Sequence, residues 1–278
     1  MLTTKFDVSK WLTTIVLAIF SILFLIPLLW MVSAAMKYEA DVLTYPIQWI
    51  PERWNAIANF KQVWFSKVSF SLFYWNSLKL AVIMTVFTLI FSSMAAFAFT
   101  KLQYKGRDYV FGLLLALMII PSESTLVPRY LLLKWLHLYN THEGLILMGM
   151  FSMYFTFLLR QFMAGIHGEY IEAAKIDGAG YWRIYAGIMV PLCKPILATV
   201  GIIKFIWSWN DYQGPLIFLI QQKLFPIPLG IQMFKNDYAD NYAVLMMASL
   251  AAIVPLLVVF IILQKQVIKG ITLGGVKG

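Results

Sequence analysis

The sequence predicts an all-α integral membrane protein with six transmembrane helices and a helix–turn–helix element on the inner side of the membrane. Hydrophobic residues make up 61% of its 278 residues and charged residues only 13%, whereas soluble domains are about 45–50% apolar and about 25% charged. The apolar residues fall in long runs, and a helix that crosses a bilayer needs about 20 of them. No polar stretch is long enough for a second domain, so we expect a single transmembrane domain over residues 1–278.

Six apolar segments are long enough to be spans. We predict them at about residues 11–36, 72–99, 109–127, 144–162, 192–220 and 242–263, with Pro121 interrupting the third. The first segment is too long for the apolar part of a signal peptide, and Met31–Met36 is not a small-residue cleavage site. We therefore expect the first segment to remain as a span.

Positive charge predicts the orientation of these spans. Lys and Arg are more frequent in the segments that a cytosolic N-terminus would place inside, so we predict that both termini are cytoplasmic. The net charge of +9 suits cytoplasmic loops that face anionic lipid heads, and no nucleic acid partner is expected. Cys193 is the single cysteine, which excludes an internal disulfide.

The longest predicted inner loop covers residues 164–191. Its first part, Glu169–Asp177, contains good helix formers, and glycines follow at 178 and 180, as they do at helix ends. A second short helix can run from Tyr181 to about Met189. Ile171 and Ala174, with Gly178 as a further candidate, fall on one side of the first helix. These properties support two interpretations equally: an interfacial loop packed on its own spans, or a docking surface for a cytosolic partner.

The residue order in this loop resembles the EAA motif of permease subunits of bacterial ABC importers. Glu172-Ala173-Ala174 is followed after three residues by Gly178, and after nine more by Ile188-Met189-Val190-Pro191. Val190 stands where the family has Leu, and His167-Gly168 stands where Ile-Pro is usual. In that family the loop is a coupling helix that sits in a cleft of the ATPase subunit. The resemblance implies that the ATPase-coupling residues are Glu172, Ala173, Ala174, Asp177, Gly178 and Pro191.

A longer stretch, roughly from Asn76 to Leu216, is similar to the maltose-type carbohydrate permeases. It contains WNSL at 75–78, KGR at 105–107, PLCKP at 191–195 and WND at 209–211. Chain length and span number resemble the second, smaller permease of a heterodimeric pair. The resemblance implies a sugar importer in the bacterial inner membrane, with a related permease, two cytosolic ABC ATPase subunits and an extracytoplasmic sugar-binding protein as partners. This chain has no G-x-x-x-x-G-K-[ST] loop, so we expect ATP and Mg to bind to the ATPase subunits and no cofactor to bind here.

A polar stripe in the fifth span is the predicted substrate pathway. Lys204, Trp207, Ser208 and Asp211 fall at i, i+3, i+4 and i+7, on one side of a helix. If this span enters the membrane near Leu192, Lys204 lies about 18 Å along it, where a lysine that faces lipid would be costly. Two alternatives stay open: Lys204 can snorkel or pair with an acid to lock helices, and Trp207 can belong to an aromatic belt. The other residues assigned to the pathway are Asn210, Asn76 and Glu123.

The alternative function is a membrane-embedded enzyme that acts on a lipid or glycan, with Glu123, Lys204 and Asp211 as its polar centre. The catalytic patterns H-E-x-x-H and G-x-S-x-G are absent from the sequence. The three histidines show no metal-ligand spacing. We therefore predict a transport subunit without its own ATPase site, catalytic residues or metal ligands.

Overall fold

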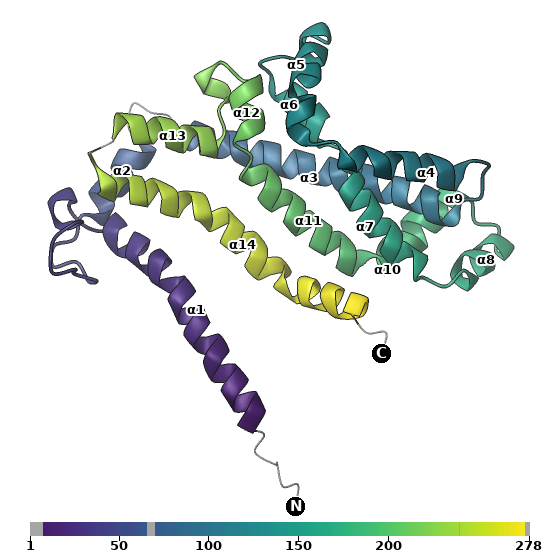
Figure 1. The fold of residues 1–278 in the computed structure, drawn as a ribbon, viewed down its shortest axis with the longest axis horizontal. Helices are drawn as coiled ribbons and strands as arrows, with labels where there is room; N and C mark the ends of the chain where they lie inside the picture. The colour runs from purple at the N-terminus through teal and green to yellow at the C-terminus, as the bar shows by residue number, and fades with distance from the viewer. Residues whose placement is uncertain (1–7, 66–69, 239, 276–278) are drawn as a thin grey trace, which may run out of the picture. The chain divides into compact units, whose positions relative to one another are not determined.

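The computed structural model describes residues 8–65, 70–238 and 240–275. Within these ranges the regular structure is helical, and Figure 1 shows the order of the elements. The α-helices are α1 (Val8–Ala35), α2 (Ala56–Trp64), α3 (Phe70–Lys101), α4 (Arg107–Ala116), α5 (Leu126–Trp135), α6 (His142–Gly149), α7 (Met153–Ala164), α8 (Glu169–Ile176), α9 (Tyr181–Ile184), α10 (Val190–Leu192), α11 (Lys194–Trp209), α12 (Gln213–Phe218), α13 (Ile227–Asp237) and α14 (Tyr242–Gly275). The 3-10 turns are η1 (Glu39–Asp41), η2 (Leu117–Ile119), η3 (Ser122–Thr125) and η5 (Gln222–Leu224), and η4 (Tyr185–Met189) is a π-helix.

Four helical segments in the described part of the chain are long and apolar enough to cross a membrane. They are Ser9–Ala35, Phe70–Lys101, His142–Ala164 and Tyr242–Gln264. Two bent pairs pass the same test: Arg107–Ile119 with Ser122–Trp135, and Tyr181–Leu192 with Lys194–Trp209. The count is six if each bent pair forms one span, which agrees with the predicted all-α membrane fold.

The bent pairs differ in detail from the predicted third and fifth spans. The pair that corresponds to the predicted third span bends by 100° at Ile120 and Pro121, where proline has no N–H to continue a helix. The fifth segment bends by 78° at Cys193, and α11 ends at Trp209, well before the predicted limit at residue 220. Asn210 donates its side-chain N–H to the carbonyl of Ile206 at this end, and α12 begins separately at Gln213.

The chain divides into two compact units. The first comprises Met1–Phe70 and Ile231–Val254, and the second comprises Ser71–Gly230 and Pro255–Gly278. This division describes how the chain packs against itself. It does not test the single transmembrane domain expected over residues 1–278, which stays a prediction.

In the first unit, the end of α1 is fixed by buried polar groups. Lys37 is fully buried, and its ammonium donates to the carbonyl of Gln48 and lies 4.6 Å from the ring centroid of Trp30. Asn59 on α2 donates to the carbonyls of Ala35 and Lys37 at 2.9 and 2.8 Å. These bonds satisfy the carbonyl of Ala35, the last residue of α1, and that of Lys37 just beyond the helix end.

The second unit has an apolar core that joins α3 and α7 to the predicted inner loop. The core includes Ala96 and Phe97 from α3 and Phe155, Leu159 and Met163 from α7. The loop residues that complete it are Ile171, Ala174, Ile184, Tyr185 and Met189. Because one core holds both the spans and the loop, the loop is positioned by packing as well as by its connections.

Candidate functional site

The predicted coupling loop folds as helix, turn and helix. The α8 helix ends at Ile176, and Gly178 follows with a φ of 77°, a left-handed conformation that suits glycine. The N–H of Gly178 donates to the carbonyl of Lys175 at 3.0 Å, and the N–H of Ala179 donates to that of Ala174 at 2.8 Å. These two bonds form a Schellman motif, which ends α8 and sets the direction in which α9 begins.

The motif residues of α8 divide between two faces. Ala174 and Ile171 are buried in the core of the second unit, as their predicted helical spacing indicated. Glu172 and Ala173 are exposed, and so are Asp177 and the turn glycine at 178. The loop is therefore packed on its own spans through one face and exposed on the other, while the role of the exposed face as a docking surface stays a prediction.

Exposed apolar side chains gather on this loop, and sequence reasoning missed them. Ile176 is 87% exposed at the end of α8, and Trp182 on α9 is 67% exposed. Tyr170 and Tyr181 are also more than half exposed, and the ammonium of Lys175 lies 5.0 Å from the ring centroid of Tyr181. The available signal was spacing, because Ile176 is out of phase with the buried pair Ile171 and Ala174.

Hydrogen bonds link this loop to α3. The hydroxyl groups of Tyr185, in the π-helix, and Ser93, in α3, lie 2.6 Å apart in a buried contact. The ammonium of Lys101, at the end of α3, donates to the carbonyl of Ile166 at 2.7 Å. Both contacts lie between segments that are far apart in sequence, so a displacement of the loop would act directly on α3 through these bonds.

A separate cavity of about 290 Å³ lies within the second unit. All four residues of the predicted polar stripe line it: Lys204, Trp207, Ser208 and Asp211. Helices α3, α5, α6 and α12 supply the remaining walls, which are Met84, Arg129, Leu145, Met148, Gly149, Gly214 and Phe218. The prediction that the stripe faces one shared space agrees with this geometry, whereas its role in transport stays a prediction.

The cavity has a defined polar arrangement. Asp211 accepts a hydrogen bond from the N–H of Gly214 at 3.0 Å, and its charge attracts that of Lys204. The hydroxyl of Ser208 is buried and has no hydrogen-bond partner among the described residues. Trp207 is 51% exposed although its ring packs 5.0 Å from that of Phe155. The indole therefore has both a packing contact and a free surface beside the cavity.

Three predicted pathway residues lie elsewhere. Asn76 is buried and donates to the carbonyls of Lys223 and Phe225, so its amide holds the segment before α13. Asn210 makes the bond at the end of α11 described above, and Glu123 is exposed on η3 beside Ser122. Glu123 does not join Lys204 and Asp211 in the cavity, so the polar centre required by the enzyme alternative is not assembled.

The cavity also contains a residue that sequence reasoning missed. Arg129 on α5 contributes a guanidinium from a helix that is distant in sequence from the stripe. No local pattern in the sequence connects Arg129 with Lys204, and only the arrangement of α5 and α11 in the fold brings them to one space.

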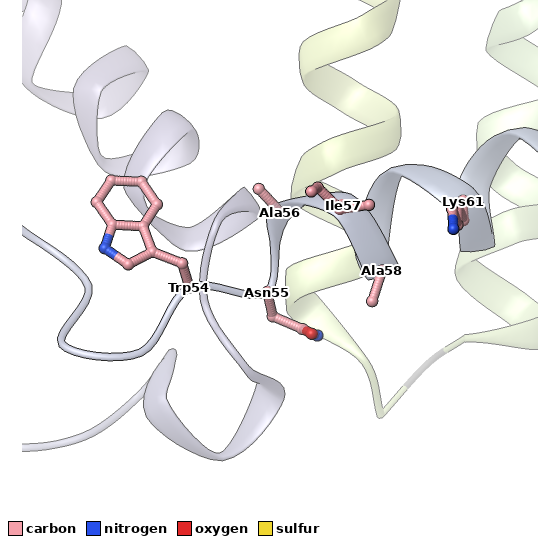
Figure 2. Close-up of a pocket in the computed structure, with 6 residues that line it drawn as sticks. All are labelled: Trp54, Asn55, Ala56, Ile57, Ala58 and Lys61. Atoms are coloured by element: carbon pink, nitrogen blue, oxygen red, sulfur yellow. The ribbon is translucent and has the colours of Figure 1, made fainter.

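Another cavity, of about 490 Å³, lies in the first unit along the start of α2 (Figure 2). Its lining comes from one short stretch of chain and consists of Trp54, Asn55, Ala56, Ile57, Ala58 and Lys61. It has a single charged side chain, Lys61, and it lacks the convergent polar groups of the cavity beside α11.

Comparison with known proteins identifies relatives along almost the whole chain. Residues 89–272 match the family described as binding-protein-dependent transport system inner membrane component. The chain is 32% identical over 272 residues to AraQ, an arabinooligosaccharides transport system permease protein of Halalkalibacterium halodurans, and the match covers 98% of each chain. It is 32% identical over 256 residues to SmoH, a sulfoquinovosyl glycerol transport system permease protein of Agrobacterium fabrum, covering 91% of this chain and 89% of SmoH.

A solved structure has the same fold. The match has a TM-score of 0.82 at 22% sequence identity, and it covers 95% of this chain and 98% of the other. That structure is of a bacterial ABC transporter involved in the import of the acidic polysaccharide alginate.

Proposed function

This chain belongs to the family of binding-protein-dependent transport system inner membrane components. We propose that it forms half of the pathway through which an ABC importer takes up a sugar. It is a multi-pass membrane permease subunit of an ABC importer. Its relatives are transport permeases, so the alternative of a membrane-embedded enzyme is not supported.

The geometry of the coupling loop is the observation that carries this proposal. The loop packs one face of α8 into the core of the spans and exposes the other, with Ile176 and Trp182 as uncovered apolar groups. Such a face is suited to bury apolar surface against a partner, while the packed face transmits displacement to the spans. A cytosolic ABC ATPase is the partner that fits the motif, with Glu172, Ala173, Asp177 and Gly178 in its cleft.

The proposed assembly contains several further chains. A related permease supplies the other half of the pathway, two cytosolic ATPase subunits bind ATP and Mg, and an extracytoplasmic binding protein delivers the sugar. The complex resides in the bacterial inner membrane with both termini of this chain in the cytoplasm, which follows the bias of Lys and Arg among its loops. Membership of the maltose-type subgroup stays a prediction from the motif.

A carbohydrate substrate is supported by relatives and by the cavity. AraQ and SmoH are named for transport of sugars or sugar derivatives, and both match at 32% identity. The cavity beside α11 offers an indole surface at Trp207 and hydrogen-bonding groups at Lys204, Ser208 and Asp211. Rings of this kind stack on sugars, while the polar groups suit hydroxyls.

Two measurements test the proposal together. The chain is purified from its native membrane in mild detergent, and co-purifying chains are identified by mass spectrometry. We expect an ATPase that carries a G-x-x-x-x-G-K-[ST] phosphate loop. Uptake is then measured in cells with labelled arabinotriose, raffinose and digalacturonate, with a deletion of this permease as the control. Absence of the ATPase would reject the docking role, and equal uptake of every sugar in the deletion strain would reject the substrate class.

A further inference from the structure

The cavity beside α11 contains two cationic side chains and one anionic side chain. Lys204 and Asp211 come from α11 and the turn after it, and Arg129 comes from α5. The ammonium and the carboxylate attract each other, and the carboxylate also accepts the N–H of Gly214. Their opposite charges cancel to a first approximation, so one positive charge remains in the cavity.

That remaining charge is at Arg129. Its side chain is half-buried, and its guanidinium makes no hydrogen bond or ion pair within residues 8–65, 70–238 and 240–275. A guanidinium carries five N–H donors in a planar fork and no acceptor, which matches the two oxygens of a carboxylate or related oxyanion. A half-buried guanidinium without a hydrogen bond or ion pair among the described residues is available to bind an anion that enters the cavity.

Neighbouring groups favour a ligand that is also a sugar. The buried Ser208 hydroxyl has no partner in the part of the chain that the structure describes, so it can bond a hydroxyl that enters the cavity. Trp207 offers part of its ring surface beside it. The volume of about 290 Å³ lies at the lower limit of small-molecule sites, about 300–1,000 Å³. A single sugar unit fits this space, with the rest of a longer chain outside it.

We propose that this cavity selects a sugar unit carrying an anionic oxyacid group, which the guanidinium of Arg129 binds through two parallel hydrogen bonds. The carboxylate of a uronic acid, a sulfonate or a phosphate ester provides the required oxygens. This assignment rests on the proposed function, because it names the substrate class of the same cavity. Lys204 and Asp211 then bind ring hydroxyls, and Arg129 determines the preference for charge.

The test is equilibrium binding to the complete importer complex in zwitterionic phosphatidylcholine nanodiscs. The probes are labelled D-glucuronate and D-glucose at fixed ionic strength, which differ in the carboxylate at C6. We expect the wild-type complex to bind glucuronate at least tenfold more tightly, since charge-assisted bidentate bonds are about twice as strong as neutral ones. Arg129→Met should remove the preference, because the loss of the guanidinium weakens the binding of glucuronate. Arg129→Lys should keep part of it, because the charge remains but the fork is lost.

Lys134→Met is the matched control. Lys134 lies on the same helix, is exposed and does not line the cavity, so its loss should leave the preference intact. Equal binding of the two probes by the wild type, or a preference that survives Arg129→Met, would overturn the anionic assignment alone. Binding of neither probe would count against the cavity as a sugar site and thus against the proposed function too.

A lipid headgroup could supply the same anion, so the measurement is repeated with phosphatidylglycerol in the nanodisc. The proposal expects the glucuronate preference already in pure phosphatidylcholine. Retention of phosphatidylglycerol that depends on Arg129, without any preference for glucuronate, would assign the guanidinium to lipid and overturn the proposal.

Discussion

The hydroxyl groups of Ser93 and Tyr185 lie 2.6 Å apart, and this buried hydrogen bond joins α3 to the π-helix of the coupling loop. The Ser93 hydroxyl also lies within hydrogen-bond reach of carbonyls of its own helix, at Leu89 and Ile90, so the two hydroxyls and the helix backbone form one buried cluster. The bond from Lys101 to the carbonyl of Ile166 also ties the loop to α3, but of these two only the Ser93–Tyr185 contact is buried on both sides. It therefore gives a direct way to test whether loop and span move together.

Tyr185→Phe should weaken that link without leaving a cavity. We expect a loss of about 1 kcal/mol in stability, the usual net value of a hydrogen bond, and less uptake per ATP hydrolysed. Thermal unfolding and coupled uptake–ATPase assays of the complex measure both. Tyr181→Phe is the control, since Tyr181 is exposed. If the ratio of uptake to hydrolysis stays at the wild-type value, the bond serves stability only.

The turn after α8 should tolerate substitution at one glycine and not at the other. An added Cβ meets no atom within 4 Å at either Gly178 or Gly180, but only Gly178 has a positive φ, 77°. Gly178→Ala should therefore cost about 1–2 kcal/mol of local stability through backbone strain, and Gly178→Asn should cost less. Gly180→Ala should be nearly neutral. Co-purification with the ATPase measures the effect, and equal loss in both alanine variants would contradict this account.

A large side chain in place of Ala173 should affect ATPase docking, whereas one in place of Ala174 should affect the stability of the permease. Ala173 is exposed, so Ala173→Trp should reduce ATPase co-purification while the thermal stability of the permease is retained. Ala174 is 9% exposed and lies in the core with Ile184 and Met189, so Ala174→Trp should overpack that core and lower stability. The same result in both variants, either stable with weak docking or unstable, would show that the two faces are wrongly assigned.

Lys204→Met should reduce sugar-dependent uptake and leave assembly with the ATPase intact. A second variant tests the same cavity from its other side. A Cβ at Gly214 would lie 2.7 Å from Oδ2 of Asp211, so Gly214→Ala should displace this carboxylate, and we expect it to reduce uptake as Asp211→Asn should. Unchanged uptake kinetics in Lys204→Met would reject the stripe as part of the pathway.

The orientation can be tested with single cysteines after Cys193→Ala. Lys105 and Glu52 are exposed in the structure. With both termini cytoplasmic, a membrane-impermeant maleimide should label Glu52→Cys from outside intact cells and should label Lys105→Cys only after lysis. The reverse pattern would invert the topology.

The sequence predicts the long helices better than their breaks. The spans around α1, α3 and α14 are uninterrupted apolar runs, and hydropathy is sufficient to locate them. Pro121 indicates a break in the third segment, but not the 100° angle, which depends on how the two halves pack. The break after Trp209 falls at Asn210 and Asp211, and Gly214 and Pro215 follow it, so the sequence does contain a local signal that the predicted span to residue 220 overlooked.

The candidate sites show the same limit. Residues 204, 207, 208 and 211 share one helix face, so spacing alone places them together. Arg129 joins them only through tertiary packing of α5, which no local pattern reports. The capped turn at Gly178 was indicated by glycine at a helix end, and Ile176 could have been predicted as exposed because it is out of phase with Ile171 and Ala174.

The π-helix at Tyr185–Met189 behaves like one residue inserted into an α-helix. Since successive α-helical residues are about 100° apart around the axis, such an insertion turns everything before it by that angle relative to everything after it. The direction in which α9 presents Trp182, relative to Pro191 and the start of α11, thus depends on this phase offset as well as on the packing of the loop. A shortened chain that lacks Gly187 would keep every motif residue yet present them in a different direction, which makes the length of this segment as specific a requirement as its composition.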